Sequence, residues 1–266
     1  NDLVDNFETR QDDVFVCTYA KSGTTWTQQI LTLLLNSGEQ GDKTYSQVVP
    51  WLEAAHFGGY LAEEARGWTP EKIVATHERR FFKSHANLKD LPCGKAPGVK
   101  VIYVCRNPKD VCVSLQHHAK NKPMYEYEGD LSDMLRFFAE GRCTNGSWFD
   151  HVLEWHEASK ADPEHIMFLR YEELLADAPA SVKRIADFVG IETTPEIVKK
   201  VVAASSISAM KSKANTQKDI NHLRKGGAGG WRDVFTVRQS EAFDALYREQ
   251  MKGSGLEMDS GEGLNM

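Results

Sequence analysis

The segment TYAKSGTTW, residues 18–26, combines a lysine, a glycine and several hydroxyl side chains in a pattern suited to holding an anion. It follows the apolar run Val14–Cys17 and leads into TQQILTLLL, which has the pattern of a helix. A helix N-terminus offers unpaired backbone N–H groups and a partial positive charge, so an anion placed on Ser22–Thr25 needs few further contacts. Lys21 adds a formal positive charge. The segment therefore predicts a phosphate-binding loop between a strand and a helix.

This loop is not spelled like an ATP-binding loop. The ATP type reads G-x-x-x-x-G-K-[ST], with the lysine after the second glycine. Here Lys21 precedes the Ser-Gly pair and the upstream glycine is absent. Taken alone, a helix start beside a solvated lysine explains the segment about as well as a phosphate site does.

Two further basic segments could bind the same kind of ligand. Arg106 ends an apolar run and precedes a predicted N-cap, where a cation opposes the helix dipole unless an anion lies between them. Ser114, about two turns into that helix, could reach the same ligand. Arg224 and Lys225 lie in a glycine-rich stretch, 222–236, that lets backbone approach a ligand closely. The alternatives are a surface arginine, a tolerated helical serine and a solvated loop.

Strands that alternate with helices must position these segments. Buried strands are predicted at Asp13–Tyr19, Val99–Cys105 and His165–Tyr171, and helices at Thr24–Ser37, after the Asn107 cap, at Ser147–Ser159 and at Pro179–Val189. This alternation predicts an α/β fold with a central parallel sheet flanked by helices and ligand sites at the carboxyl ends of the strands. Both TYAKSGTT and CRNPKD fall at such ends.

Composition limits the classes of function. The 266 residues predict one domain, 1–266, with a glycine-rich acidic tail, about 252–266, that frays. A net charge of −6 disfavours general nucleic-acid or membrane-surface binding. The longest apolar run, 30–35, is too short to span a bilayer, and the five cysteines, odd in number and without a C-x-x-C pair, favour reduced thiols in the cytoplasm.

Four ordered segments resemble the signature segments of the cytosolic sulfotransferase family. They are TYAKSGTTW, FFKSH at 81–85, VIYVCRNPKDVCVS at 101–114, and RKGGAGGW followed by FTV at 224–237. The resemblance covers residues 10 to about 258. It implies that the loop at residues 18–26 binds the 5′-phosphosulfate end of 3′-phosphoadenosine 5′-phosphosulfate (PAPS), that the other two basic segments hold its 3′-phosphate, and that adenosine 3′,5′-bisphosphate is the product.

The resemblance also implies which residues bind the cofactor: Lys21, Ser22, Gly23, Thr24, Thr25, Trp26, Arg106, Ser114, Tyr171, Ser205, Ile207, Met210, Arg224, Lys225 and Gly226. Trp26 and Tyr171 are expected near the adenine. Ile207 stands where the family usually has a stacking aromatic ring, so affinity should rest more on Trp26 and the phosphate contacts. Ala20 replaces a usual proline and Gly230 a usual aspartate. Helix packing and core filling remain alternatives for Trp26 and Met210.

Lys83 and His85 in FFKSH lie two residues apart and share a face if the segment is extended, with Ser84 pointing away. By resemblance, His85 is the general base, Lys83 stabilises the moving sulfuryl oxygens, and Lys21 stabilises the leaving phosphate oxygen. A sulfuryl group carries less charge than a phosphoryl group, so lysines and backbone donors can replace Mg²⁺, and no metal is expected. Without the resemblance, one histidine among nine is more often structural.

The acceptor is expected to be a small molecule with a hydroxyl or amine group. Phe57, Phe81, His117 and Tyr125 lie in segments that line the family's acceptor pocket, which favours an apolar or aromatic acceptor, although ordinary core or loop roles explain them equally well. Residues 232–241 resemble the family's dimerisation segment, but Thr236 and Gln239 also form a helix capping box.

Two other functions compete with sulfuryl transfer. The misplaced lysine disfavours a P-loop kinase, and the presence of both Lys83 and His85 disfavours a non-catalytic adenine-nucleotide binding module.

Overall fold

Four short parallel strands form the centre of the fold in the order β2-β1-β3-β4. They are β1 (Val14–Cys17), β2 (Phe81–Ser84), β3 (Lys100–Cys105) and β4 (Ile166–Arg170). Val14 pairs with Phe81 on one side and with Lys100 on the other, and Cys105 pairs with Arg170. The computed structural model describes residues 2–61, 63–94, 96–213 and 226–258.

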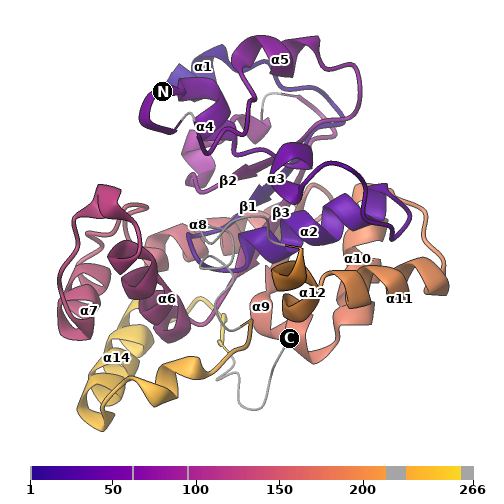
Figure 1. The fold of residues 1–266 in the computed structure, drawn as a ribbon. Helices are drawn as coiled ribbons and strands as arrows, with labels where there is room; N and C mark the ends of the chain where they lie inside the picture. Colours follow the sequence, from indigo (N-terminus) through magenta and orange to yellow (C-terminus); the bar gives the residue numbers. More distant parts are fainter. Residues whose placement is uncertain (1, 62, 95, 214–225, 259–266) are drawn as a thin grey trace.

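One face of the sheet is covered by helices that follow the first and last strands (Figure 1). These are α2 (Thr24–Leu35), α9 (Tyr171–Ala176), α10 (Ala178–Val189), α11 (Pro195–Ala204) and α12 (Ile207–Ser212). Val14 and Val16 of β1 pack here with Ile30 of α2 and Ile185 of α10. Since alternate strand residues point to opposite faces, this cluster takes every second residue of β1.

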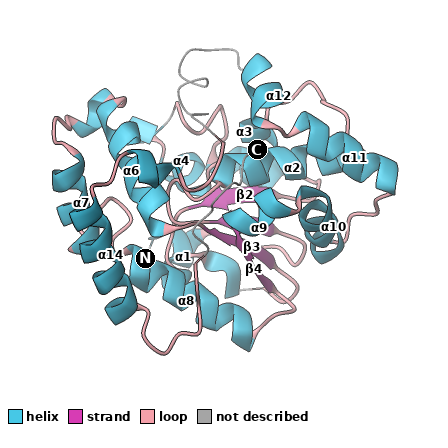
Figure 2. Cartoon of the chain, turned by 90° about the horizontal axis from the view of Figure 1, so that it is seen from below, coloured by secondary structure: helices cyan, strands magenta, loops and turns pink. Residues whose placement is uncertain are grey.

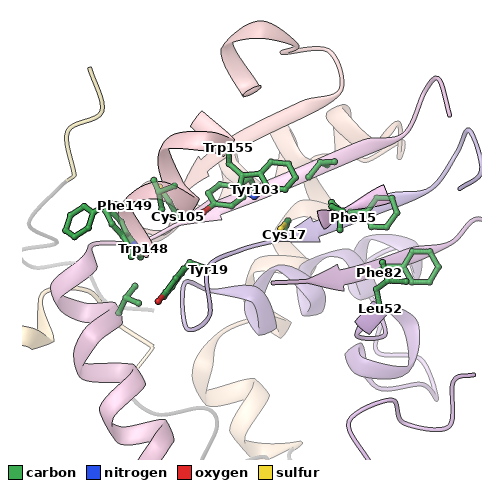
Figure 3. Packing of buried hydrophobic residues seen from close by; sticks show 14 of the residues in the cluster. Phe15, Cys17, Tyr19, Leu52, Phe82, Tyr103, Cys105, Trp148, Phe149 and Trp155 are labelled. Atoms are coloured by element: carbon green, nitrogen blue, oxygen red, sulfur yellow. The ribbon is translucent and has the colours of Figure 1, made fainter. Parts of the chain in front are cut away.

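The other face carries an aromatic cluster, seen closely in Figure 3. Its helices are α1 (Asp2–Asn6), α6 (Pro108–Lys120), α7 (Leu131–Ala139), α8 (Trp148–Ala161) and α14 (Val237–Gln250). Tyr103 of β3 stacks on Trp155 of α8 with ring centroids 5.3 Å apart. With both faces covered, all four residues of β1 are buried, which explains its continuous apolar sequence.

Short elements link the strands, several of them beside β2 in Figure 1. They are α3 (Tyr45–Val48), α4 (Leu52–Phe57), α5 (Pro70–Ala75) and the 3₁₀ turns η1 (Gly59–Leu61), η2 (Leu88–Asp90), η3 (Pro92–Gly94), η4 (Pro123–Tyr125) and η5 (Gly230–Asp233). The view of Figure 2 shows the sheet enclosed by helices. The predicted fold class, an α/β domain with a central parallel sheet, is confirmed.

The three predicted strands and four predicted helices are present with shifted ends. The strand predicted at Asp13–Tyr19 is shorter, Val14–Cys17, because Thr18 and Tyr19 already belong to the loop. Asn107 caps α6, as predicted, by accepting a hydrogen bond from the N–H of Lys109. Among the described residues, no helix combines the length and apolarity that a membrane crossing requires.

The tail from residue 252 was predicted to fray, and this is wrong for residues 252–258. Leu256 is buried, and its carbonyl oxygen accepts a hydrogen bond from the Tyr247 hydroxyl. Arg170 donates to the carbonyl oxygen of Glu257 at 2.9 Å. The apolar Leu256 outweighs the surrounding glycines because it can be buried against the fold. The rest of that prediction, 259–266, lies outside the described residues.

An ion pair buried at the entrance to β1 joins it to β2. Nε of Arg80 donates to Oδ1 of Asp13 at 2.7 Å, and both side chains are almost fully buried. The guanidinium also lies over the rings of Phe7 and Phe82. A charge buried this deeply is strongly destabilising when its partner is removed.

We expect Asp13→Ala to lower the free energy of unfolding by about 3 kcal/mol or more, because it leaves the Arg80 guanidinium buried without its counter-ion. Urea denaturation measures this. Asp187→Ala breaks the exposed pair with Lys183 and should cost about 1 kcal/mol or less. Equal losses in the two variants would contradict this account.

Candidate active site

The predicted anion loop connects β1 to α2 in a strained conformation. Lys21 has φ of 71° and Gly23 has φ of 111°, both in the left-handed region. The N–H of Ser22 donates to the carbonyl oxygen of Tyr19, which closes the turn. The hydroxyls of Thr18 and Thr24 lie 2.7 Å apart inside it. α2 therefore begins with its N-terminal N–H groups at the mouth of a tight loop.

Gly23 is required by a close neighbour as well as by its backbone angle. A Cβ atom at this position would lie 2.7 Å from the Tyr171 ring. Tyr171 in turn meets Trp26 edge to face, with ring centroids 5.5 Å apart. The loop, the first turn of α2 and the start of α9 thus form one aromatic-walled corner.

Arg106 joins this corner to the glycine-rich segment. Its guanidinium lies 4.4 Å from the centroid of the Tyr171 ring, and it donates to the carbonyl oxygens of Gly227 at 2.7 Å and Lys21 at 3.4 Å. Ser114 is buried further along α6. All three predicted basic segments therefore meet at Arg106.

The remaining predicted cofactor residues are split between α12 and the glycine-rich segment. Met210 belongs to the same buried cluster as Trp26 and Tyr171, and Ser205 is buried just before α12. A Cβ on Gly226 would lie 2.8 Å from Cβ of Ile207, so these two residues are in contact. The predicted residues Arg224 and Lys225 lie outside the described residues.

Two neighbours in α6 hold the glycine-rich segment and were not singled out from the sequence. The buried carboxylate of Asp110 accepts hydrogen bonds from the N–H groups of Gly229 at 2.6 Å and Trp231 at 3.0 Å. Lys109 pairs with Asp244 of α14 and lies over the Trp231 ring. The only signal was the pair Lys-Asp directly after the N-cap of this helix, and nothing local indicated its partners.

Lys83 and His85 approach the loop from β2. Lys83 Nζ lies 4.3 Å from the centroid of the Trp51 ring, and the His85 ring lies 5.7 Å from it. The hydroxyl of Ser84 instead donates to Oε1 of Glu53 at 2.7 Å. Both side chains of the predicted pair thus face Trp51, as the two-residue spacing implies.

The hydrogen bonds of His85 define its tautomer. Nδ1 lies 2.9 Å from the carbonyl oxygen of Thr18, which can only accept, so Nδ1 carries the proton. Nε2 is then left with a lone pair. Burial, followed by the positive charge of Lys83, lowers the pKa of His85 to about 3 and keeps it neutral. Burial lowers the pKa of Lys83 to about 8, against the opposing charge of Glu53.

The predicted acceptor residues are spread over different environments. Phe57 and Tyr125 are exposed, whereas Phe81 is buried in the core on the α2 face. His117 is exposed, and the adjacent His118 points inward. Burial and the positive charges of Lys21, Lys122 and Lys83 lower the pKa of His118 to about 3, so His118 lies on the same side of the molecule as these lysines. The rotation of α6 about its axis decides which of the two histidines points inward, and the sequence does not specify that rotation.

Three buried polar atoms around the loop have no hydrogen-bond partner among the described residues. They are Oγ of Ser22, Nε1 of Trp26 and Nε of Arg106. Two of these are N–H donors and the third is a hydroxyl, so they fit an anionic nucleotide. Among all the residues that the structure describes, no group of three or more His, Cys, Asp or Glu side chains could hold a metal ion.

Comparison with known proteins places this geometry in a family. The model of the Sulfotransferase domain family matches residues 11–255. The chain belongs to the sulfotransferase family. Human sulfotransferase 2B1 is 37% identical over 270 residues, covering 92% of this chain and 68% of that protein.

Solved structures agree. Mouse sulfotransferase SULT7A1 complexed with PAP aligns with a TM-score of 0.80 and 31% identity over 95% of this chain and 89% of that one. Retinol dehydratase in complex with androsterone and the inactive cofactor PAP aligns with a TM-score of 0.77 and 27% identity over 96% and 85% of the two chains. The predicted family and its PAPS-dependent sulfuryl transfer to small molecules are therefore confirmed.

We expect Gly23→Ala to weaken binding of adenosine 3′,5′-bisphosphate roughly tenfold or more, because Cβ would meet the Tyr171 ring at a positive φ and displace the loop. Calorimetric titration measures this. Gly190→Ala is the matched control, since Gly190 has a φ of +72° with no atom within 4 Å of its Cβ position among the described residues. It should lose stability and keep wild-type affinity. Wild-type affinity in Gly23→Ala would remove this loop from the cofactor site.

Proposed function

We propose that this sulfotransferase uses His85 as the general base in transferring a sulfuryl group to a hydroxyl or amine of a small apolar or aromatic acceptor. The carrying observation is the hydrogen bond from Nδ1–H of His85 to Thr18, which leaves Nε2 free of a proton beside Lys83. A neutral imidazole in this tautomer can accept a proton.

When bound, PAPS would supply an activated sulfuryl group, whose bond to a phosphate oxygen breaks as the acceptor oxygen or nitrogen attacks sulfur. Nε2 of His85 would take the acceptor's proton as the new S–O or S–N bond forms. The Lys83 ammonium stabilises charge on the sulfuryl oxygens, and Lys21 stabilises the charge left on the phosphate oxygen. These roles divide the reaction between β2 and the loop after β1.

The remaining cofactor contacts follow the predicted set. The N–H groups at Ser22–Thr25 would hold the 5′-phosphate, the Trp26–Tyr171 corner the adenine, and Arg106 with Ser114 the 3′-phosphate. Arg224, Lys225 and Gly226 would complete the 3′-phosphate site from the glycine-rich segment. An anion bound here offsets the positive charges beside His85, so it raises the pKa of His85 and makes the imidazole a stronger base.

The acceptor site would lie on the Trp51 side of Lys83 and His85. Exposed apolar side chains on the flanking segments, Phe57 at 52% and Tyr125 at 39% exposed, support an apolar or aromatic acceptor. The ring centroid of His118, the neighbour of the predicted His117, lies 5.8 Å from that of Tyr125, so His118 would also lie on this side. The structurally similar retinol dehydratase binds androsterone, which is a small and largely apolar molecule like the acceptor proposed here.

We also propose a cytoplasmic protein that forms a homodimer through residues 232–241. The five cysteines are all free thiols, which suits a reducing compartment. In the dimer segment, Val234 and Val237 are 42% and 75% exposed, so both are available to pack against a second copy of the chain. The Thr236–Gln239 capping box is present, so it accounts for those two residues but not for the exposed valines.

Substitution of His85 tests the catalytic proposal. We expect His85→Ala to lower kcat by roughly 10²- to 10⁴-fold, the usual contribution of a general base, while the affinity for adenosine 3′,5′-bisphosphate stays unchanged. Initial rates with PAPS and a panel of phenols, steroids and amines measure kcat, and calorimetry measures affinity. His165→Ala alters a surface histidine beyond α8 and should transfer at the wild-type rate. Near wild-type kcat in His85→Ala would rule out the base role.

The dimer is tested separately. We expect Val237→Glu to yield monomers in sedimentation velocity, because a charge would be buried at the interface. Val74→Glu, at another exposed valine, 62% exposed, should leave the sedimentation coefficient at the wild-type value. A wild-type protein that sediments as a monomer at micromolar concentration would defeat the proposal.

A further inference from the structure

Glu53, absent from every sequence motif, has its carboxylate against Ser84 and the backbone of His85. It lies in the first turn of α4, two residues after Trp51. Oε1 accepts a hydrogen bond from the Ser84 hydroxyl at 2.7 Å and another from the N–H of His85 at 3.1 Å. One carboxylate oxygen therefore contacts the backbone of the general base and the residue before it.

These contacts fix the short segment that follows β2. The strand ends at Ser84, so His85 has no ladder partner of its own. The Ser84 oxygen that donates to Glu53 also accepts from the N–H of Ala86 at 3.0 Å. Glu53, Ser84 and Ala86 thus form a hydrogen-bonded turn around His85, whose ring is held at the other end by Thr18.

The second oxygen of Glu53 has a different environment. Oε2 is inaccessible to solvent and has no hydrogen-bond partner in the described part of the chain. A glutamine would make the same Oε1 contacts without the cost of a buried charge. The negative charge therefore needs another explanation, and Lys83, which precedes Ser84 in β2, is a cation whose charge interacts with that of Glu53.

Lys83 is half-buried among charges of both signs. Its backbone N–H donates to the carbonyl oxygen of Pro50, so β2 and the approach to α4 run side by side. Besides Glu53, the charged groups that face Lys83 are Glu64, Lys122 and Arg66. Glu64 is shared with Lys122 in an ion pair at 3.1 Å. The charge of Glu53 attracts the Lys83 ammonium and opposes the burial that lowers the pKa of Lys83 to about 8.

We propose that Glu53 is a positioning residue of the sulfuryl-transfer site, which holds the backbone of His85 in place and whose negative charge keeps Lys83 in its ammonium form. The inference rests on the proposed roles of His85 and Lys83. It also ties the Trp51 wall of the acceptor site to the catalytic pair, because both are attached to the start of α4.

Burial also acts on Glu53 itself, raising the pKa of its carboxyl group. The hydrogen bonds from Ser84 and from the N–H of His85, and the charge of Lys83, all oppose this shift. The carboxylate and the ammonium therefore stabilise each other's charged forms. Removing the charge on one should be visible in the titration of the other.

The experiment compares Glu53→Gln with Ser84→Ala in the full chain. In protein labelled with ¹³Cε-lysine, free of cofactor, we expect the Lys83 signal of Glu53→Gln to titrate about one pH unit lower than in the wild type. Ser84→Ala keeps the charge and should leave the Lys83 titration unchanged. Glu64→Gln removes a more exposed charge and should produce a smaller shift than Glu53→Gln.

Kinetics with PAPS and 2-naphthol then separate charge from position. The alkaline limb of the kcat–pH profile should move to lower pH in Glu53→Gln, and kcat should fall roughly tenfold in Ser84→Ala with an unmoved limb. An unmoved Lys83 titration and alkaline limb in Glu53→Gln would overturn the proposal. The NMR titration needs no turnover, so failure of the proposed catalytic roles would appear separately, as wild-type transfer that does not depend on His85.

Discussion

The hydrogen bond from Nδ1–H of His85 to the carbonyl oxygen of Thr18 sets the relation between the two halves of the site. Thr18 begins the anion loop after β1, and His85 is the first residue after the adjacent strand β2. Because the strands are parallel and in register, Cys17 beside Ser84, both loops leave the same edge of the sheet. The bond fixes which ring nitrogen of His85 carries the proton and holds the ring against the start of the anion loop.

The backbone carbonyl group of His85 is also held by hydrogen bonds. Its carbonyl oxygen accepts from Nε2–H of His151 at 3.2 Å and from the amide of Asn145 at 3.3 Å. His151 is fully buried, and its Nδ1 bonds to the hydroxyl of Tyr103 on β3 at 2.8 Å. Hydrogen bonds to Thr18, Asn145 and His151 therefore converge on His85. His151 in turn bonds to Tyr103 of β3. A side chain held at this many points is already oriented before any ligand binds, which in the proposed role of His85 would reduce the entropy lost on reaching the transition state.

The fold could be predicted from sequence because its signals are local. A strand buried on both faces reads as a continuous apolar run, and Asn107-Pro108 marks a helix start regardless of context. The contiguous motifs likewise contained the loop and the Lys83–His85 pair. Glu53 and Asp110 could not be found this way, because their partners lie 31 and 119 residues away. Which of His117 and His118 points inward depends on the exact phase of α6, which residue patterns do not specify.

The site is built at some cost to the free protein. Lys21 adopts a left-handed backbone, Ser22 and Arg106 bury polar atoms without partners among the described residues, and Lys83 is desolvated near other cations. Each feature raises the energy of the free site. An anion bound in the loop, as proposed, would pair with the unpaired donors and offset the positive charge near Lys83, although it would not change the backbone of Lys21. The protein has a net charge of −6, yet positive charges gather at this site. Because these charges repel one another, contacts with the rest of the fold must hold the segments that carry them in place. Asp110 and Glu53, buried carboxylates at the two ends of the site, do this by anchoring the glycine-rich segment and the His85 turn.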